Sequence, residues 1–85
     1  MEKPNTTEFE QFVIDKVRQM RKEKGISQKE LANLLDVSIG FIGQVESSRH
    51  RAKYNLNHIN ELSFVLNCSP QEFLPKKGIK NKIKK

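Results

Sequence analysis

The stretch SQKELANLLDVSIGFIGQVE, residues 27–46, contains two short apolar repeats separated by a turn. Ser27 and Glu30 have the spacing of a capping box, which predicts the start of a helix, and Ser38 predicts the start of the next one. Ala32 is small enough to let the second helix cross the first closely, and Asp36 falls in the turn between them. The apolar residues after the turn have the spacing of an inner helix face; they are Val37, Ile42 and Val45. The stretch therefore predicts two short helices packed across a tight turn.

Helix signals continue on both sides of this stretch, whereas strand signals are weak. Thr7 and Glu10 form another capping box, and the helix that follows should end near Gly25. Asn55 or Asn57 should cap a fourth helix, and the sequence Ser-Pro-Gln-Glu at 69–72 should open a short fifth helix that ends near Leu74. We therefore predict an all-α fold, a compact five-helix bundle. Its expected core comprises Phe12, Val13, Val17, Met20, Ile26, Leu31, Ala32, Leu35, Val37, Ile42, Val45, Leu56, Ile59, Leu62, Leu66, Phe73 and Leu74.

Eighty-five residues provide for one small domain, and their formal net charge is +6. This charge is unevenly placed: residues 16–53 carry +5, residues 76–85 carry +6, and acidic segments at 1–15 and 54–75 balance the central region. We expect a folded domain at 1–75 with a flexible lead at 1–6. The Lys-rich tail, 76–85, has too little apolar content to fold alone and is expected to be disordered. The basic central segment points to an anionic partner.

The spacing of residues 28–45, together with Arg18, Arg21 and Gly25, resembles the lambda-repressor-like helix-turn-helix family, which includes phage repressors, Cro and the xenobiotic-response-element regulators. The resemblance extends from about Val13 to Leu74. It implies a transcriptional regulator that binds double-stranded DNA, with the third helix (about 38–47) in the major groove. The resemblance also implies a structural salt bridge between Arg21 and Glu46, although two separately solvated charges would be the plainer interpretation.

The same resemblance assigns two groups of DNA-contacting residues. The residues expected to face bases are Ile39, Gly40, Gly43 and Gln44. The residues expected to contact phosphates, at the start of the second helix and in and around the basic loop, are Gln28, Lys29, Ser38, Arg49, Arg51 and Lys53.

Two features depart from the family pattern. The turn has Asp36 where the family usually has glycine, and Asp tolerates a left-handed backbone better than most residues. The reading helix presents Gly40 and Gly43, which have no side chain to donate to a base. Gln44 suits adenine and Ile39 suits a thymine methyl, so direct base readout is thin. We therefore expect phosphate contacts and DNA shape to supply much of the affinity.

Other classes of function find little support in the residues. The lone Cys68 is most simply a small filler, and with two histidines that lack partners at ligand spacing it cannot build a metal site. We predict no enzyme activity and no cofactor. The apolar runs are too short for a membrane span and the N-terminus lacks a signal peptide pattern, so we expect a cytoplasmic protein.

The tail and the partner leave alternatives open. The tail could be a solubilising end, could add non-specific DNA affinity, or, least plausibly, could attach to a membrane. We expect a homodimer on paired half-sites, joined through the fifth helix near Phe73 and Leu74. The alternative function is that of an antitoxin or adaptor whose main role is protein–protein interaction, for example with a toxin.

Overall fold

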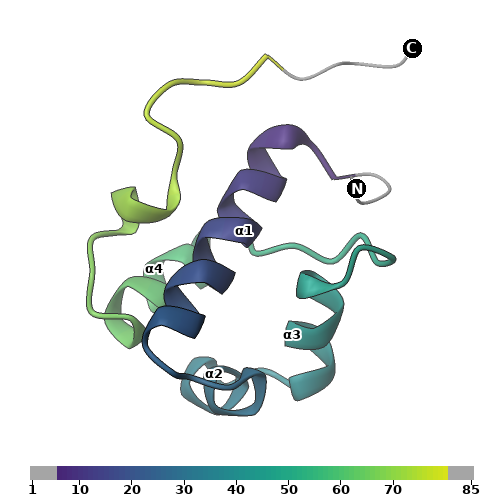
Figure 1. Cartoon of the computed structure of the whole chain (residues 1–85), viewed down its shortest axis with the longest axis vertical. Coiled ribbons are helices and arrows are strands. Elements are labelled where there is room, and N and C mark those ends of the chain that lie inside the picture. Colours follow the sequence, from purple (N-terminus) through teal and green to yellow (C-terminus); the bar gives the residue numbers. More distant parts are fainter. Residues whose placement is uncertain (1–5, 81–85) are drawn as a thin grey trace.

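The computed structural model describes residues 6–80, which form four α-helices and one short 3₁₀ helix, with no strand in this range (Figure 1). The α-helices are α1 (Glu8–Glu23), α2 (Gln28–Leu35), α3 (Ile39–Glu46) and α4 (Leu56–Val65), and the 3₁₀ helix is η1 (Pro70–Phe73). An all-helical fold is thus confirmed, but the prediction of a fifth α-helix is wrong. Residues 70–73 lie between two prolines, and their turns close through i to i−3 bonds such as Glu72 N–H to Ser69 O at 2.9 Å.

Side-chain caps set the start of each helix. Thr7 and Ser27 each accept a hydrogen bond from the backbone of a glutamate three residues on, and each glutamate accepts a bond from the backbone of its cap in return. Ser38 caps α3 and Asn55 caps α4, where His58 takes the place of the usual glutamate. These bonds satisfy backbone N–H groups that have no partner inside the helix, so local sequence defines the helix starts.

The turn between α2 and α3 depends on one left-handed residue. Asp36 has φ 58° and ψ 45°, and Val37 N–H bonds back to Ala32 O at 3.0 Å. This i to i−5 bond closes the end of α2 and turns the chain toward α3. Ala32 is buried where α2 and α3 pack, as the need for close crossing predicts.

The core joins all five elements. Its fully enclosed side chains come from every helix, and they include Val17, Leu31, Ile42, Val45, Leu62, Leu66 and Phe73. Ile14, which was not among the predicted core residues, is also buried, whereas Phe12 is 40% exposed. The inward face of α1 is therefore the row containing 13, 14, 17 and 21, rotated slightly from the predicted one.

Three further core predictions are wrong or need adjustment. Leu56 is 86% exposed because it is the first residue of α4 and points away from the side that carries Ile59 and Leu62. Leu74 lies at the edge of the core and is partly exposed. Phe73 is fully buried beneath η1, so it is not available for the dimer contact predicted there.

The chain after η1 extends without regular secondary structure through residue 80 and runs back toward the start of α1 (Figure 1). Ile79 is half-buried and lies near Phe12. The remainder of the predicted disordered tail, 81–85, and most of the predicted flexible lead, 1–5, lie outside the described residues.

Candidate nucleic-acid interface

The outer face of α3 is defined by what its inner face buries. Ile42 and Val45 are completely enclosed, and Ser38 Oγ fixes the first turn by accepting from Phe41 N–H at 3.0 Å. With those two side chains inward, the helical period turns a different set of residues outward. The structure places Ile39, Gly40 and Gln44 exposed on this face, with Gly43 half-buried beside them.

The two glycines of α3 are not required by packing. A Cβ on Gly40 would come 3.8 Å from Ser38 Oγ, and a Cβ on Gly43 would come 3.8 Å from Gln28 Oε1. Both are ordinary van der Waals distances, and both residues have helical backbone geometry. Since glycine lowers helix stability relative to alanine, neither residue improves the fold. Their effect is to leave the backbone of α3 uncovered on its outer face.

A buried ion pair holds the end of α3 against α1. Arg21 donates from Nε to Glu46 Oε2 at 3.0 Å and from its terminal nitrogen to Oε1 at 2.9 Å. The third arm of the guanidinium donates to Ile26 O at 2.7 Å, so this buried group is well satisfied. The Glu46 side chain is only 3% exposed. This geometry matches the salt bridge implied by the family resemblance.

Two more residues join this pair, and no pattern in the sequence indicates that they do. Gln28 donates from Nε2 to Glu46 Oε1 at 3.0 Å, and the partly exposed Arg18 lies 3.8 Å from the same oxygen. Glu46 thus connects α1, α2 and α3. A primary amide nitrogen carries two hydrogens, so Gln28 keeps a second donor while the first is used internally. Its orientation is therefore set by Glu46.

The loop after α3 carries the exposed cations Arg49 and Arg51. Within residues 6–80, neither of them forms an ion pair, whereas Lys53 Nζ lies 3.1 Å from Glu10 Oε2. Burial opposes ionisation of Glu10, but hydrogen bonds from the Thr7 backbone and the contact with Lys53 lower the pKa of this carboxyl. The three cations predicted to contact phosphates are thus not equivalent, because Lys53 already has a carboxylate partner.

An aromatic cluster anchors the base of this loop. Tyr54 meets Phe41 edge-on, with ring centroids 6.2 Å apart, and His58 lies 5.1 Å from Phe41 and 5.9 Å from Tyr54. Burial raises the pKa of the Tyr54 phenol, so this residue is neutral at physiological pH. The cluster ties the loop to α3 and α4. Periodicity could not reveal it, because Tyr54 lies outside any helix.

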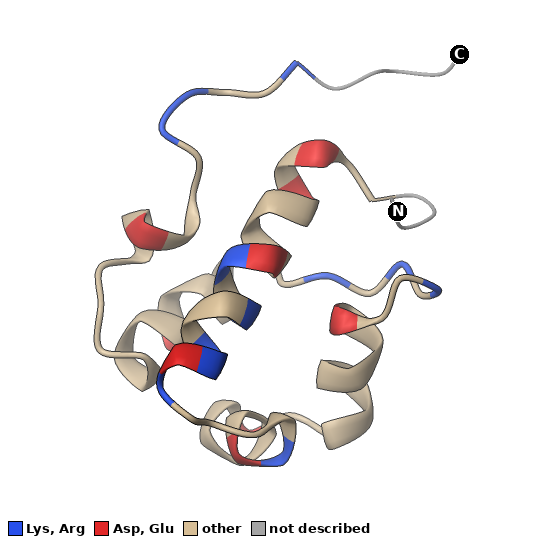
Figure 2. Cartoon of the chain, viewed as in Figure 1, with Lys and Arg blue, Asp and Glu red and all other residues tan. Residues whose placement is uncertain are grey.

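The charges of the molecule are segregated. Figure 2 shows Lys and Arg on the loop after α3 and along the second half of α1, whereas acidic residues occupy the first turn of α1. Gln28 touches Glu46, and Arg49 follows Glu46 by three residues, so the start of α2 and the basic loop both flank the end of α3. An exposed helix face is thus bordered by polar and cationic groups.

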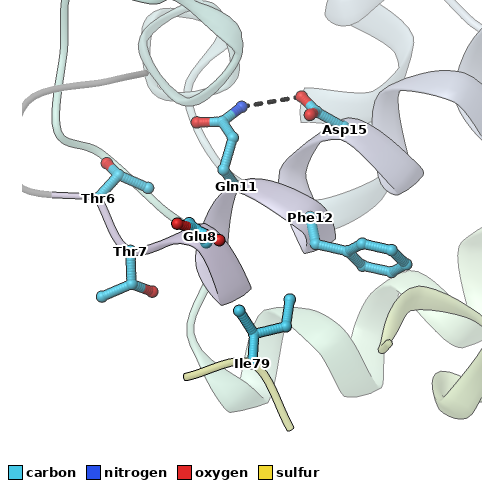
Figure 3. A pocket seen from close by; sticks show the side chains of 7 residues that line it. All are labelled: Thr6, Thr7, Glu8, Gln11, Phe12, Asp15 and Ile79. Carbon is cyan, nitrogen blue, oxygen red and sulfur yellow. Dashed lines mark hydrogen bonds between the residues drawn. The ribbon is translucent and has the colours of Figure 1, made fainter. Parts of the chain in front are cut away.

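A cavity of about 490 Å³ lies elsewhere, at the start of α1. It is open and is lined by Thr6, Thr7, Glu8, Gln11, Phe12, Asp15 and Ile79 (Figure 3). Gln11 uses its amide nitrogen to bond Asp15 Oδ1 at 2.8 Å, and the lining residues include no nucleophile paired with a base. Across the described part of the chain no group of histidine, cysteine or acidic residues is placed to hold a metal ion. In the same range, no helix is both long and apolar enough to cross a bilayer.

Comparison with known proteins places this geometry in a recognised family. Residues 17–73, which contain the turn, the network around Glu46 and the basic loop, match the helix-turn-helix family model HTH_3. A search of curated proteins found no match.

Three solved structures are similar in fold and sequence. The restriction-modification controller protein C.AhdI from Aeromonas hydrophila is 28% identical, with a TM-score of 0.63, over 74% of this chain and 92% of that one. The hypothetical transcription factor NHTF from Neisseria is 25% identical, with a TM-score of 0.65, over 86% of each chain. The N-terminal DNA binding domain of SinR from Bacillus subtilis is 26% identical, with a TM-score of 0.61, over 78% of this chain and 94% of that one.

Proposed function

Because the chain belongs to the lambda-repressor-like helix-turn-helix family, whose members are DNA-binding regulators rather than enzymes, we propose how it holds double-stranded DNA. In this proposal the outer face of α3 enters the major groove, while the start of α2 and the basic loop contact backbone phosphates. The observation that carries it is the exposed, side-chain-poor face of α3 bordered by Gln28, Lys29, Arg49 and Arg51.

Base recognition on this face depends on few side chains. Gln44 offers an amide of the kind that pairs with adenine, and Ile39 offers an apolar surface for a thymine methyl group. Gly40 and Gly43 add no base contact but allow the backbone of α3 to approach the groove closely. Affinity then comes largely from phosphates and from the shape of the duplex.

Phosphate contact should differ between the cations of the loop. Arg49 and Arg51 are exposed and enter no ion pair with another described residue, so each is suited to replace a counterion on the duplex. Lys53 must first leave Glu10, which reduces what it contributes. Gln28 is held by Glu46 in one orientation and therefore suits a directional bond to a phosphate oxygen rather than a diffuse attraction.

A fluorescence anisotropy titration over a range of salt concentrations tests this proposal. The probes are duplexes from the region upstream of the gene and a scrambled control. Replacing Arg49 and Arg51 by alanine should lower the slope of log K against log salt by about 0.9 for each phosphate that is no longer neutralised. Lys53→Ala is the matched control from the same loop and should change the slope less. Absence of binding to every duplex at low salt would refute the proposal.

The tail can be tested in the same titration. Residues 76–85 carry six lysines, which can release further counterions if they reach the duplex. A chain ending at residue 75 should bind more weakly with a smaller salt slope, while its preference for the upstream duplex over the scrambled one should be unchanged. A changed preference would mean that the tail takes part in sequence recognition.

One observation favours a second function. The two glycines leave α3 with little direct readout, which also suits an antitoxin or adaptor that uses this fold to hold another protein. A toxin-like reading frame directly beside the gene, together with a stable complex of the two purified proteins, would favour this alternative. We nevertheless place DNA first, because a protein-binding role gives no reason for the exposed arginines of the loop.

Two copies on paired half-sites complete the proposed function. In a twofold arrangement, the two α3 helices would lie roughly 34 Å apart along the duplex, one helical turn of DNA. The buried position of Phe73 leaves the contact between the copies to another surface.

A further inference from the structure

The outer side of α4 carries the two large apolar residues that are most exposed in the described part of the chain. Leu56 is 86% exposed and Phe64 is 76% exposed. The opposite side of the same helix contributes Ile59, Leu62 and Leu66 to the core. Neither exposed side chain stabilises the monomer by burial, so their apolar character calls for another explanation.

The positions of these residues form a symmetric pattern. Leu56 and Phe64 are eight residues apart, and the exposed Asn60 lies midway between them. Residues at i, i+4 and i+8 form one continuous ridge on a helix, here about 12 Å long. Reversing the direction of this ridge exchanges Leu56 with Phe64 and leaves Asn60 in place. The ridge is therefore complementary to a second, antiparallel copy of itself.

We infer that this ridge, Leu56–Asn60–Phe64, is the surface on which a second copy of the chain docks; the inference rests on the proposed DNA-binding function, for which it names the partner. Two α4 helices cross antiparallel, so that Leu56 of each copy packs on Phe64 of the other. The two Asn60 side chains meet at the twofold axis, where one amide can donate to the other. Ridges of this kind interlock at an angle near roughly −50° between the helix axes.

Charge argues for a second copy over other occupants. Glu61 is the one acidic residue of α4, the helix has no lysine or arginine, and Glu61 lies beside the ridge rather than on it. DNA phosphates or an anionic membrane would find no cation on this surface. Two copies would meet without placing like charges directly opposite each other, and each polar ridge centre would gain a matching amide.

The expected strength follows from the small size of the contact. Two leucines and two phenylalanines form a compact apolar centre, which corresponds to a weak interface rather than a permanent one. We expect a dissociation constant of roughly micromolar order without DNA, and tighter association on a duplex with two half-sites.

Sedimentation velocity on the full chain tests the ridge. Phe64→Glu and Leu56→Glu should each raise the dimer dissociation constant by about 30-fold or more, the change expected for an interface centre. Both residues are exposed, so circular dichroism should show the wild-type helix content. Leu34→Glu is the matched control, because Leu34 is an exposed leucine on α2. Unchanged dimerisation in both ridge variants, or equal loss in the control, would overturn the inference.

Cross-linking tests the antiparallel arrangement. In a Cys68→Ser background, Asn60→Cys should link to its own copy through a short bismaleimide. Leu56→Cys and Phe64→Cys should link efficiently when mixed and poorly when each is treated separately. Efficient linking of Leu56→Cys to itself, with no gain on mixing, would refute the antiparallel pairing.

Binding to a single half-site separates this inference from the proposed function. If the wild-type chain binds a half-site duplex but remains monomeric at high concentration and on a paired site, the inference fails and the function stands. If the chain dimerises through the ridge but binds no duplex at low salt, the function fails and the ridge stands.

Discussion

Replacing both glycines of α3 by alanine should make the protein more stable and a weaker DNA binder. Each added Cβ meets its nearest neighbour at 3.8 Å, so neither substitution requires the fold to move. Gly43 lies inside the helix, where alanine is favoured by about 1 kcal/mol, and Gly40 in the first turn should contribute less. A gain of about 1 kcal/mol in the free energy of unfolding raises the Tm of a domain this size by roughly 4–8 °C.

The same methyl groups would separate α3 from the groove. If the helix backbone approaches the duplex at these residues, as proposed, the two methyls should weaken binding by about tenfold or more, equivalent to about 1.4 kcal/mol. Thermal unfolding by circular dichroism measures the gain in stability, and anisotropy measures the loss of affinity.

A control separates stability from contact. Asn33→Ala on α2 also replaces an exposed helical residue by a better helix former, but it leaves the outer face of α3 unchanged. This variant should be stabilised and should bind DNA as the wild type does. Wild-type affinity in the double alanine variant of α3 would refute the close approach of its backbone to DNA, even if its Tm rises as expected.

Three further predictions concern the fold around this face. Glu46→Gln should lower the free energy of unfolding by about 3–5 kcal/mol in chemical denaturation, because it leaves the buried guanidinium of Arg21 without its counter-charge; a loss below about 1 kcal/mol would contradict the importance of the pair. Asp36→Gly should raise the free energy of unfolding by up to about 1 kcal/mol, since glycine adopts the left-handed backbone of this position without strain, and denaturation midpoints that fall instead would contradict this account. Glu10→Gln should destabilise the domain at neutral pH but not in acid: the pKa of Glu10 is lowered in the folded state, so its contribution is present above the unfolded carboxyl pKa and is lost as the pH falls through the folded one. Melting curves of both proteins across this pH range would have to converge at low pH, and a gap that persists there would disprove the assignment.

The local features of this fold were predictable from the sequence because their causes are local. The capping boxes of α1 and α2 each involve residues three positions apart, and their spacing is visible in the sequence itself. The left-handed turn at Asp36 and the buried Ala32 follow from the short distance between two helices that must pack. These features also carry the family resemblance, which the match over residues 17–73 confirms.

Predictions failed where the outcome depends on distant neighbours. Periodicity allowed either Phe12 or Ile14 to face inward, and the packing of other helices against α1 selects Ile14. Leu56 fits the apolar period of α4 but lies at its first residue, beyond the side that the core covers. The short η1 is not an α-helix because four residues between prolines cannot complete a second turn.

The candidate site shows the same division. The outward residues of α3 follow from its period, whereas the partners of the flanking polar residues do not. Gln28 bonds to Glu46, eighteen positions away, and Lys53 bonds to Glu10, forty-three positions away. Neither pairing leaves a pattern in the sequence, yet together they decide which polar groups remain available to a partner.

The network around Glu46 has a consequence for how this protein can change its target. Because Arg21 and Gln28 hold the end of α3 from the inside, the angle of that helix is independent of the side chains on its outer face. Substitutions at Ile39, Gly40 or Gln44 would therefore alter the preferred DNA sequence without altering the pose. Evolution, or a designer, can exchange the operator by changing a few exposed residues on an unchanged scaffold.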